Sequence, residues 1–217
     1  AITASGRPVA FVDTDQGGSR RIDMTSTDAG AVLRFLNLYE YMRGGEISLA
    51  LSGPRGGALS GSIDARNFWI VNEPRLSSLV SSTPPGDNRS LSQAVRREID
   101  TQSVEFERGY SRIVKGDNGI SLEGGILRGP LIGMSFQGML SDAQGNVALT
   151  GTFMPAYGLN RIFGEIPLIG QILGNGRDRG LIGITFRLLG AKDNPQLAIN
   201  PLSVVAPGIF RSVFEFR

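Results

Sequence analysis

Apolar and polar residues alternate with a period of two along much of this chain. A period of two places successive side chains on opposite faces of an extended strand. Residues 46–52 give the clearest example, because Ile47, Leu49 and Leu51 fall on one face and polar or small residues on the other. The same alternation recurs at residues 59–63, 120–126, 132–140, 147–153, 181–189 and 197–199.

Short runs of turn-forming residues separate these segments. Gly53, Pro54, Gly56 and Gly57 form one such run, Arg-Gly-Pro occupies 128–130, and Asp-Ala-Gln-Gly occupies 142–145. Connections this short join antiparallel neighbours, whereas parallel strands need long crossovers. The pattern therefore predicts a mostly β protein, a ladder of antiparallel hairpins with a few short helices.

Helical signals are few. Residues 25–28 offer N-cap side chains before an apolar stripe at helical spacing, and this helix is expected to end near Asn37, before the Gly44-Gly45 pair. Ser90 and Gln93 have capping-box spacing, which predicts a second helix over residues 90–100. We expect a single domain over residues 1–217, with a helix and turn insert at 20–45, a loop and helix insert at 81–101 and a tail at 201–217.

Composition excludes several kinds of chemistry. The chain has no histidine and no cysteine, so histidine-based catalysis, thiolate nucleophiles, disulfides and the usual imidazole or thiol metal ligands are ruled out. The net charge is only +2, without the clustered lysine and arginine that nucleic-acid binding needs. We therefore expect a protein that is not an enzyme, uses no cofactor and binds no nucleic acid.

The remaining motifs are weak. The glycines of residues 174–180 have a spacing one residue too long for a dinucleotide loop, and a strand pattern follows them. Asp13 with Asp15, and Glu105 with Glu107, lie two residues apart and could bind a cation, but a solvated strand face produces the same spacing. A hydrolase that uses only carboxylates is a distant alternative, since it would need these groups gathered in one pocket.

Several segments, taken in order, resemble the C-terminal region of AsmA-like proteins, in particular large YhdP-like members of Gram-negative bacteria. The segments are residues 155–160 with 166–170, then 180–190, 193–195, 200–203 and 206–208. Upstream, the similar pieces are residues 28–30, 43–45, 59–61 and 71–74. Residues 81–100 depart from the resemblance because they are more polar than the apolar helical stretch expected there.

The resemblance implies the periplasmic part of an inner-membrane anchored protein, whose curled, twisted sheet forms an open groove or half-barrel that carries phospholipid towards the outer membrane. Glycines such as Gly124, Gly138 and Gly151 would permit the curl. The expected acyl-chain contacts are Ile132, Met134, Phe136, Leu140, Val147, Leu149, Phe153, Ile182, Ile184 and Phe186. A contact with a membrane or an envelope protein is expected at Phe210, Val213 and Phe214, with packing over the end of the sheet as the alternative.

The same apolar faces have a second interpretation. They could form the closed core of a β domain that binds partner proteins through its sheet edges and so supports outer-membrane assembly. Composition and periodicity do not separate a closed core from an open groove.

Overall fold

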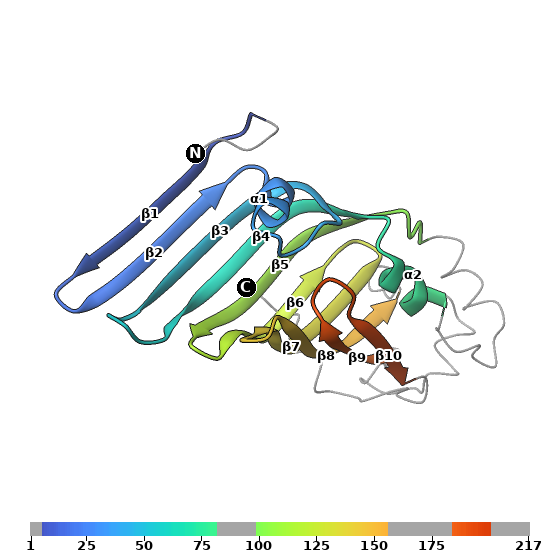
Figure 1. Cartoon of the computed structure of the whole chain (residues 1–217). Coiled ribbons are helices and arrows are strands. Elements are labelled where there is room, and N and C mark those ends of the chain that lie inside the picture. Colours follow the sequence, from blue (N-terminus) through green and yellow to red (C-terminus); the bar gives the residue numbers. More distant parts are fainter. Residues whose placement is uncertain (1–5, 82–98, 156–183, 201–217) are drawn as a thin grey trace, which may run out of the picture.

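The computed structural model describes residues 6–81, 99–155 and 184–200. In this part of the chain, ten strands form one open sheet in which each strand is antiparallel to the next along the sequence, from β1 at one edge to β10 at the other (Figure 1). The strands are β1 (Val9–Gln16), β2 (Ser19–Ser26), β3 (Met42–Pro54), β4 (Leu59–Val71), β5 (Ser103–Gly116), β6 (Gly119–Arg128), β7 (Ile132–Asp142), β8 (Asn146–Pro155), β9 (Ile184–Ala191) and β10 (Gln196–Asn200). The mostly β, antiparallel prediction is confirmed.

The register divides the side chains into two faces. Residues directly opposite each other on antiparallel strands point to the same side of the sheet. One such row runs Met24, Leu49 and Ile63, and its neighbour runs Thr25, Ser48 and Asp64. We call the side that carries Met24 the apolar face and the opposite side the polar face.

Helix α1 (Ala29–Phe35) connects β2 to β3 and packs on the apolar face. Its N-cap is Asp28, whose carboxylate accepts the backbone N–H of Ala31 at 3.0 Å. Ala29 and Val32 are buried against the strands, so this helix covers one end of the sheet. The helix predicted to end near Asn37 is confirmed, although the surrounding insert is narrower than expected, because residues 20–26 and 42–45 belong to β2 and β3.

Helix α2 (Pro74–Ser81) connects β4 towards β5 and was not predicted. Pro74 opens the helix, where its fixed φ and missing N–H are tolerated. Leu76, Leu79 and Val80 are buried on the apolar face. The helix predicted over 90–100 lies mostly outside the described residues; Ile99 and Asp100, which are described, are not helical.

In the long strands β3, β4 and β5, the alternation of the two faces shifts by one residue at neighbouring positions on the three strands. Met42 and Ile47 are both buried on the same face although regular alternation would put residues 42 and 47 on opposite faces. Between them, Gly44 and Gly45 have φ values of 63° and 83°, and Asn67 on β4 has φ 52°. A side chain at Gly45 would place its Cβ 2.7 Å from the Cβ of Phe68, so glycine is required there. The shift keeps apolar residues on one face at both ends of these strands.

One predicted alternation, at residues 120–126, is wrong because β6 contains a bulge. The register with β7 shifts between Leu122 and Gly125, and Gly124 has φ 57°. Ile126 therefore lies opposite Tyr110 and Ser135 on the polar face, and not beside Leu122 as strict alternation predicts. The other strands and turns predicted downstream of residue 46 are confirmed within the described residues.

Candidate functional site

The apolar face carries two clusters of buried side chains. The first lies under both helices and includes Phe68, Phe106, Ile132, Phe153 and Ile184. The rings of Phe68 and Phe106 stack with centroids 5.5 Å apart, and Phe153 and Ile132 have no exposed surface. This end of the apolar face is a packed core.

The second cluster differs from the first in that no helix of the described residues contributes to it. Its buried floor consists of Leu51, Leu59, Ile113 and Leu122, from β3 to β6. Around this floor lie six partly buried apolar side chains: Ile22, Leu49, Ile120, Phe136, Leu140 and Leu149. All of these residues belong to strands, and among the described residues no helix contributes to the cluster. We call this set the open apolar cluster.

The predicted acyl-chain contacts that the structure describes differ in exposure. Ile132, Phe153 and Ile184 are at most 1% exposed, and Val147 and Phe186 are 6% and 8% exposed, so these five are core residues. The partly exposed members of the predicted set are Met134, Phe136, Leu140 and Leu149. Ile182 and the predicted tail contacts Phe210, Val213 and Phe214 lie outside the described residues.

Two phenylalanines of the apolar face cover glycines on neighbouring strands. A Cβ at Gly125 would lie 2.3 Å from the ring of Phe136, and one at Gly151 would lie 2.6 Å from the ring of Phe186. Each glycine thus leaves room for the ring beside it. These contacts account for Gly151, which the sequence analysis had assigned to the curl of the sheet.

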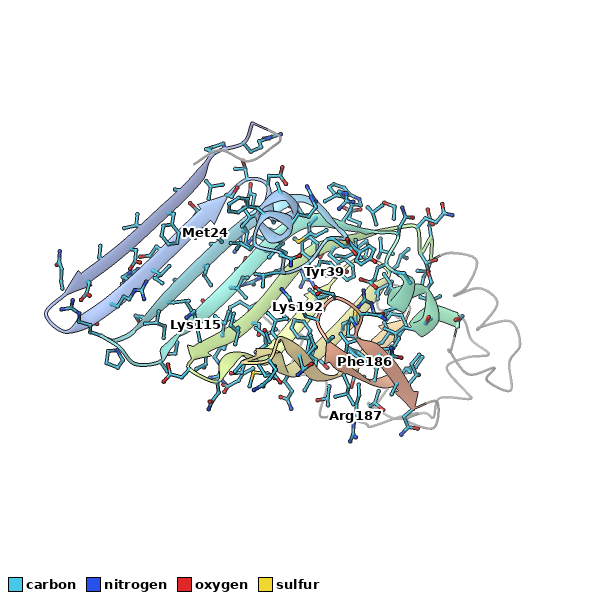
Figure 2. All side chains as sticks on the ribbon, in the orientation of Figure 1. Met24, Tyr39, Lys115, Phe186, Arg187 and Lys192 are labelled. Carbon is cyan, nitrogen blue, oxygen red and sulfur yellow. The ribbon has the colours of Figure 1, made fainter. Side chains whose placement is uncertain are left out.

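The apolar face extends beyond the residues that alternation identified. Phe11 on the edge strand β1 lies opposite Met24 and is 59% exposed. A separate contact links the turn between β9 and β10 to the segment after α1. Nζ of Lys192 donates a hydrogen bond to the carbonyl oxygen of Asn37 at 3.4 Å, and Figure 2 shows Lys192 in the same region as Tyr39. Phe11 was missed because β1 alternates for too few residues.

Ion pairs hold the candidate carboxylates on both faces of the sheet, and Asp13 and Asp15, opposite Ile22 and Arg20, lie on the side that carries Met24. Asp13 and Asp15 pair with Arg20 at 2.8 Å and with Arg55 at 3.1 Å. The hydrogen bond from Arg20 holds the pKa of Asp13 below its usual value. Elsewhere on the sheet, Glu107 pairs with Arg128 at 3.1 Å. These carboxylates face arginines, which supports the solvated-face interpretation.

A further buried polar group joins the connection between β2 and β3 to the connection between β4 and β5. Glu73 is 7% exposed. Its carboxylate accepts a hydrogen bond from the hydroxyl of Tyr39 at 2.8 Å and another from Nε of Arg75 at 2.6 Å. Burial, followed by the nearby Glu73 carboxylate, raises the pKa of Tyr39 well above its usual value. These hydrogen bonds fix the segment before β3 to the start of α2.

In the ranges that the structure describes, no three acidic side chains gather to hold a metal ion. The helices of the same ranges are all too short or too polar to cross a bilayer. Comparison of the chain with models of known protein families, with curated proteins and with solved structures returned no match.

Proposed function

We propose that this chain is a non-enzymatic module that handles lipid, and that the open apolar cluster contacts acyl chains. One observation carries the proposal: six partly exposed apolar side chains from β2, β3, β6, β7 and β8 surround a buried apolar floor, with no helix from the described residues among them. Large continuous apolar surfaces on a protein generally mark contact sites.

The energetics suit this ligand. Each acyl methylene removed from water contributes about 0.8 kcal/mol, so a chain lying along several strands binds through area and not through specific polar contacts. The members of the open apolar cluster are apolar, and the charged residues in register with them are Lys115, opposite Leu59 and Ile120, and Asp13, opposite Ile22 and paired with Arg20. Little headgroup selection is expected from it. The finer proposal is that the sheet curls into a groove or half-barrel which, in the periplasm, forms part of a bridge that carries phospholipid between the two membranes.

Partial exposure also limits which residues take part. Phe136, Leu140 and Leu149 remain in the proposed contact surface, together with Leu49 on β3, whereas Met134 packs against the covered cluster. Ile132, Phe153 and Ile184 belong to the covered cluster and are excluded, since side chains with almost no exposed surface do not meet a ligand in this conformation. The proposed surface is therefore smaller than the sequence analysis expected and displaced towards the β3–β4, β5–β6 and β7–β8 turns.

A pair of leucines on adjacent strands provides a matched test. Leu149 belongs to the open apolar cluster, whereas Leu189 lies on the polar face of β9 and is 44% exposed. Native mass spectrometry of gently purified protein, with lipid extraction, should detect phospholipid in the wild type and in Leu189→Asp, and much less in Leu149→Asp. Circular dichroism confirms that both variants are folded.

The opposite outcome has a clear meaning. A wild-type protein that is free of lipid and also fails to bind added fluorescent phospholipid would show that the cluster is closed. The chain would then be better described as an interaction module that uses its exposed sheet edges.

A further inference from the structure

The connection from α1 to β3 exposes large apolar side chains at one end of the sheet. Phe35 is 88% exposed, Leu36 is 48% exposed and Leu38 is 39% exposed. These three residues lie within four consecutive positions, outside the open apolar cluster. We call them the apolar tip. Exposing them to water costs free energy that contact with an apolar partner would recover.

The hydrogen bonds of the helix end hold the tip in place. The N–H of Leu38 donates to the carbonyl of Leu33 at 2.9 Å, and the N–H of Asn37 donates to the carbonyl of Arg34 at 3.0 Å. Asn37 has φ 52°, so this end is a Schellman motif with asparagine in the left-handed position. These bonds fix the backbone that presents the three side chains of the tip.

Three cationic side chains flank the apolar tip, because Arg34 precedes it in the chain, Arg43 follows it and Lys192 contacts Asn37 within it. Arg34 donates to the carbonyl of Met42 at 2.6 Å, Arg43 donates to the carbonyl of Glu40, and Lys192 donates to the carbonyl of Asn37. The described contacts of these three side chains are backbone carbonyls and not carboxylates, so their positive charges are not neutralised by ion pairs within the described ranges. Glu40 is the one acidic residue between Arg34 and Arg43 in the sequence.

Exposed apolar side chains bordered by cations match the chemistry of an anionic bilayer surface, in which acyl chains lie beneath phosphate groups. We propose that the apolar tip inserts into the interfacial region of an anionic membrane, while Arg34, Arg43 and Lys192 meet lipid phosphates. The tip and the open apolar cluster share no residue, so membrane docking and acyl-chain binding can fail independently.

The test is flotation of the protein with vesicles of phosphatidylglycerol and phosphatidylcholine, compared with phosphatidylcholine alone. Wild-type protein should float with the anionic vesicles, and less at high salt because the electrostatic part is screened. Leu36→Asp should weaken binding by about tenfold or more, since a charge replaces an inserted apolar group. Leu189→Asp is the matched control and should float like the wild type, because Leu189 has similar exposure but lies on the polar face of β9.

A spectroscopic readout gives depth directly. Trp69 is the single tryptophan of the chain, so Phe35→Trp in a Trp69→Phe background places one reporter at the tip. Its emission should shift to the blue on addition of anionic vesicles. Absence of both flotation and shift, or equal flotation of Leu36→Asp and wild type, would overturn the proposal. So would a concentration-dependent dimer that Leu36→Asp dissociates, since the tip would then bind a second copy of this chain.

The same variants separate this proposal from the lipid-handling function. Leu36→Asp should still bind monomeric fluorescent phospholipid, and Leu149→Asp should still float with anionic vesicles. Loss of only one of the two activities in each variant is the expected result, and loss of both in Leu36→Asp would contradict the separation.

Discussion

Replacing Phe153 with alanine should destabilise the protein far more than replacing Phe136 with alanine, although both rings lie on the apolar face. Phe153 has no exposed surface and packs in the core beneath the helices, so its removal leaves a cavity and costs about 3–5 kcal/mol. Domains are typically stable by only about 5–15 kcal/mol, which makes this a large fraction of the total. Phe136 is partly exposed. Burying a phenylalanine fully is worth about 1.5–3 kcal/mol, so truncation of a partly buried ring should cost less than about 2 kcal/mol.

Urea unfolding followed by circular dichroism measures both changes, with the slope of free energy against urea serving as the check on two-state behaviour. An unchanged slope would allow the two midpoints to be compared directly. A loss for Phe136→Ala equal to that for Phe153→Ala would refute the reasoning, because it would place Phe136 in a closed core. The proposed acyl-chain surface would then lose its central aromatic residue.

Three further predictions concern stability. Gly61→Ala should destabilise the protein by about 1–3 kcal/mol, because the new Cβ would collide with a backbone carbonyl of β3. The Cβ of Gly116→Ala would meet nothing closer than 3.7 Å, so this variant should be neutral or slightly more stable than wild type. Thermal melts of both variants give the comparison. Tyr39→Phe should cost about 1–3 kcal/mol, since it removes a hydroxyl donor from the buried Glu73 carboxylate, and urea unfolding measures that loss. Asp142→Ala should destabilise the β7–β8 turn at neutral pH, because the backbone N–H of Asn146 holds the pKa of Asp142 below its usual value. The carboxylate contributes in full above the unfolded pKa of about 3.9 and loses its contribution as pH falls through the lowered folded value, so the difference from wild type should vanish in acid.

The antiparallel ladder follows from local sequence, because alternation and turn residues act over a few neighbouring positions. Residues 46–52 and 132–140 alternate cleanly. Both segments lie in strands, and their alternating apolar residues share one face as expected. The failures also have local causes. Gly124 adopts a left-handed conformation that moves Ile126 to the other face, and a single sequence does not distinguish such a bulge from a glycine in regular strand.

Helix α2 could have been found from the sequence. Pro74 suits the first helical position, and Leu76, Leu79 and Val80 follow at helical spacing. The Asn-Glu-Pro run was instead assigned only as part of the resemblance. Glu73 has a role that sequence does not indicate, since its partner Tyr39 lies 34 residues earlier in the chain.

The open apolar cluster could not be located from the sequence, because alternation reports which face is apolar and not what covers it. Phe153 and Leu149 stand four residues apart on β8, share one face and carry similar apolar side chains. Phe153 lies in the cluster covered by α1 and α2, and Leu149 lies in the cluster to which no described helix contributes. Coverage depends on where the connections between strands fold back. Among the described residues, α1 and α2 pack on the cluster that holds Phe153, while the cluster towards the β3–β4, β5–β6 and β7–β8 turns has a buried floor with partly buried side chains around it. Which cluster a residue joins, and its place within that cluster, therefore depends on tertiary cover and not on alternation along its strand.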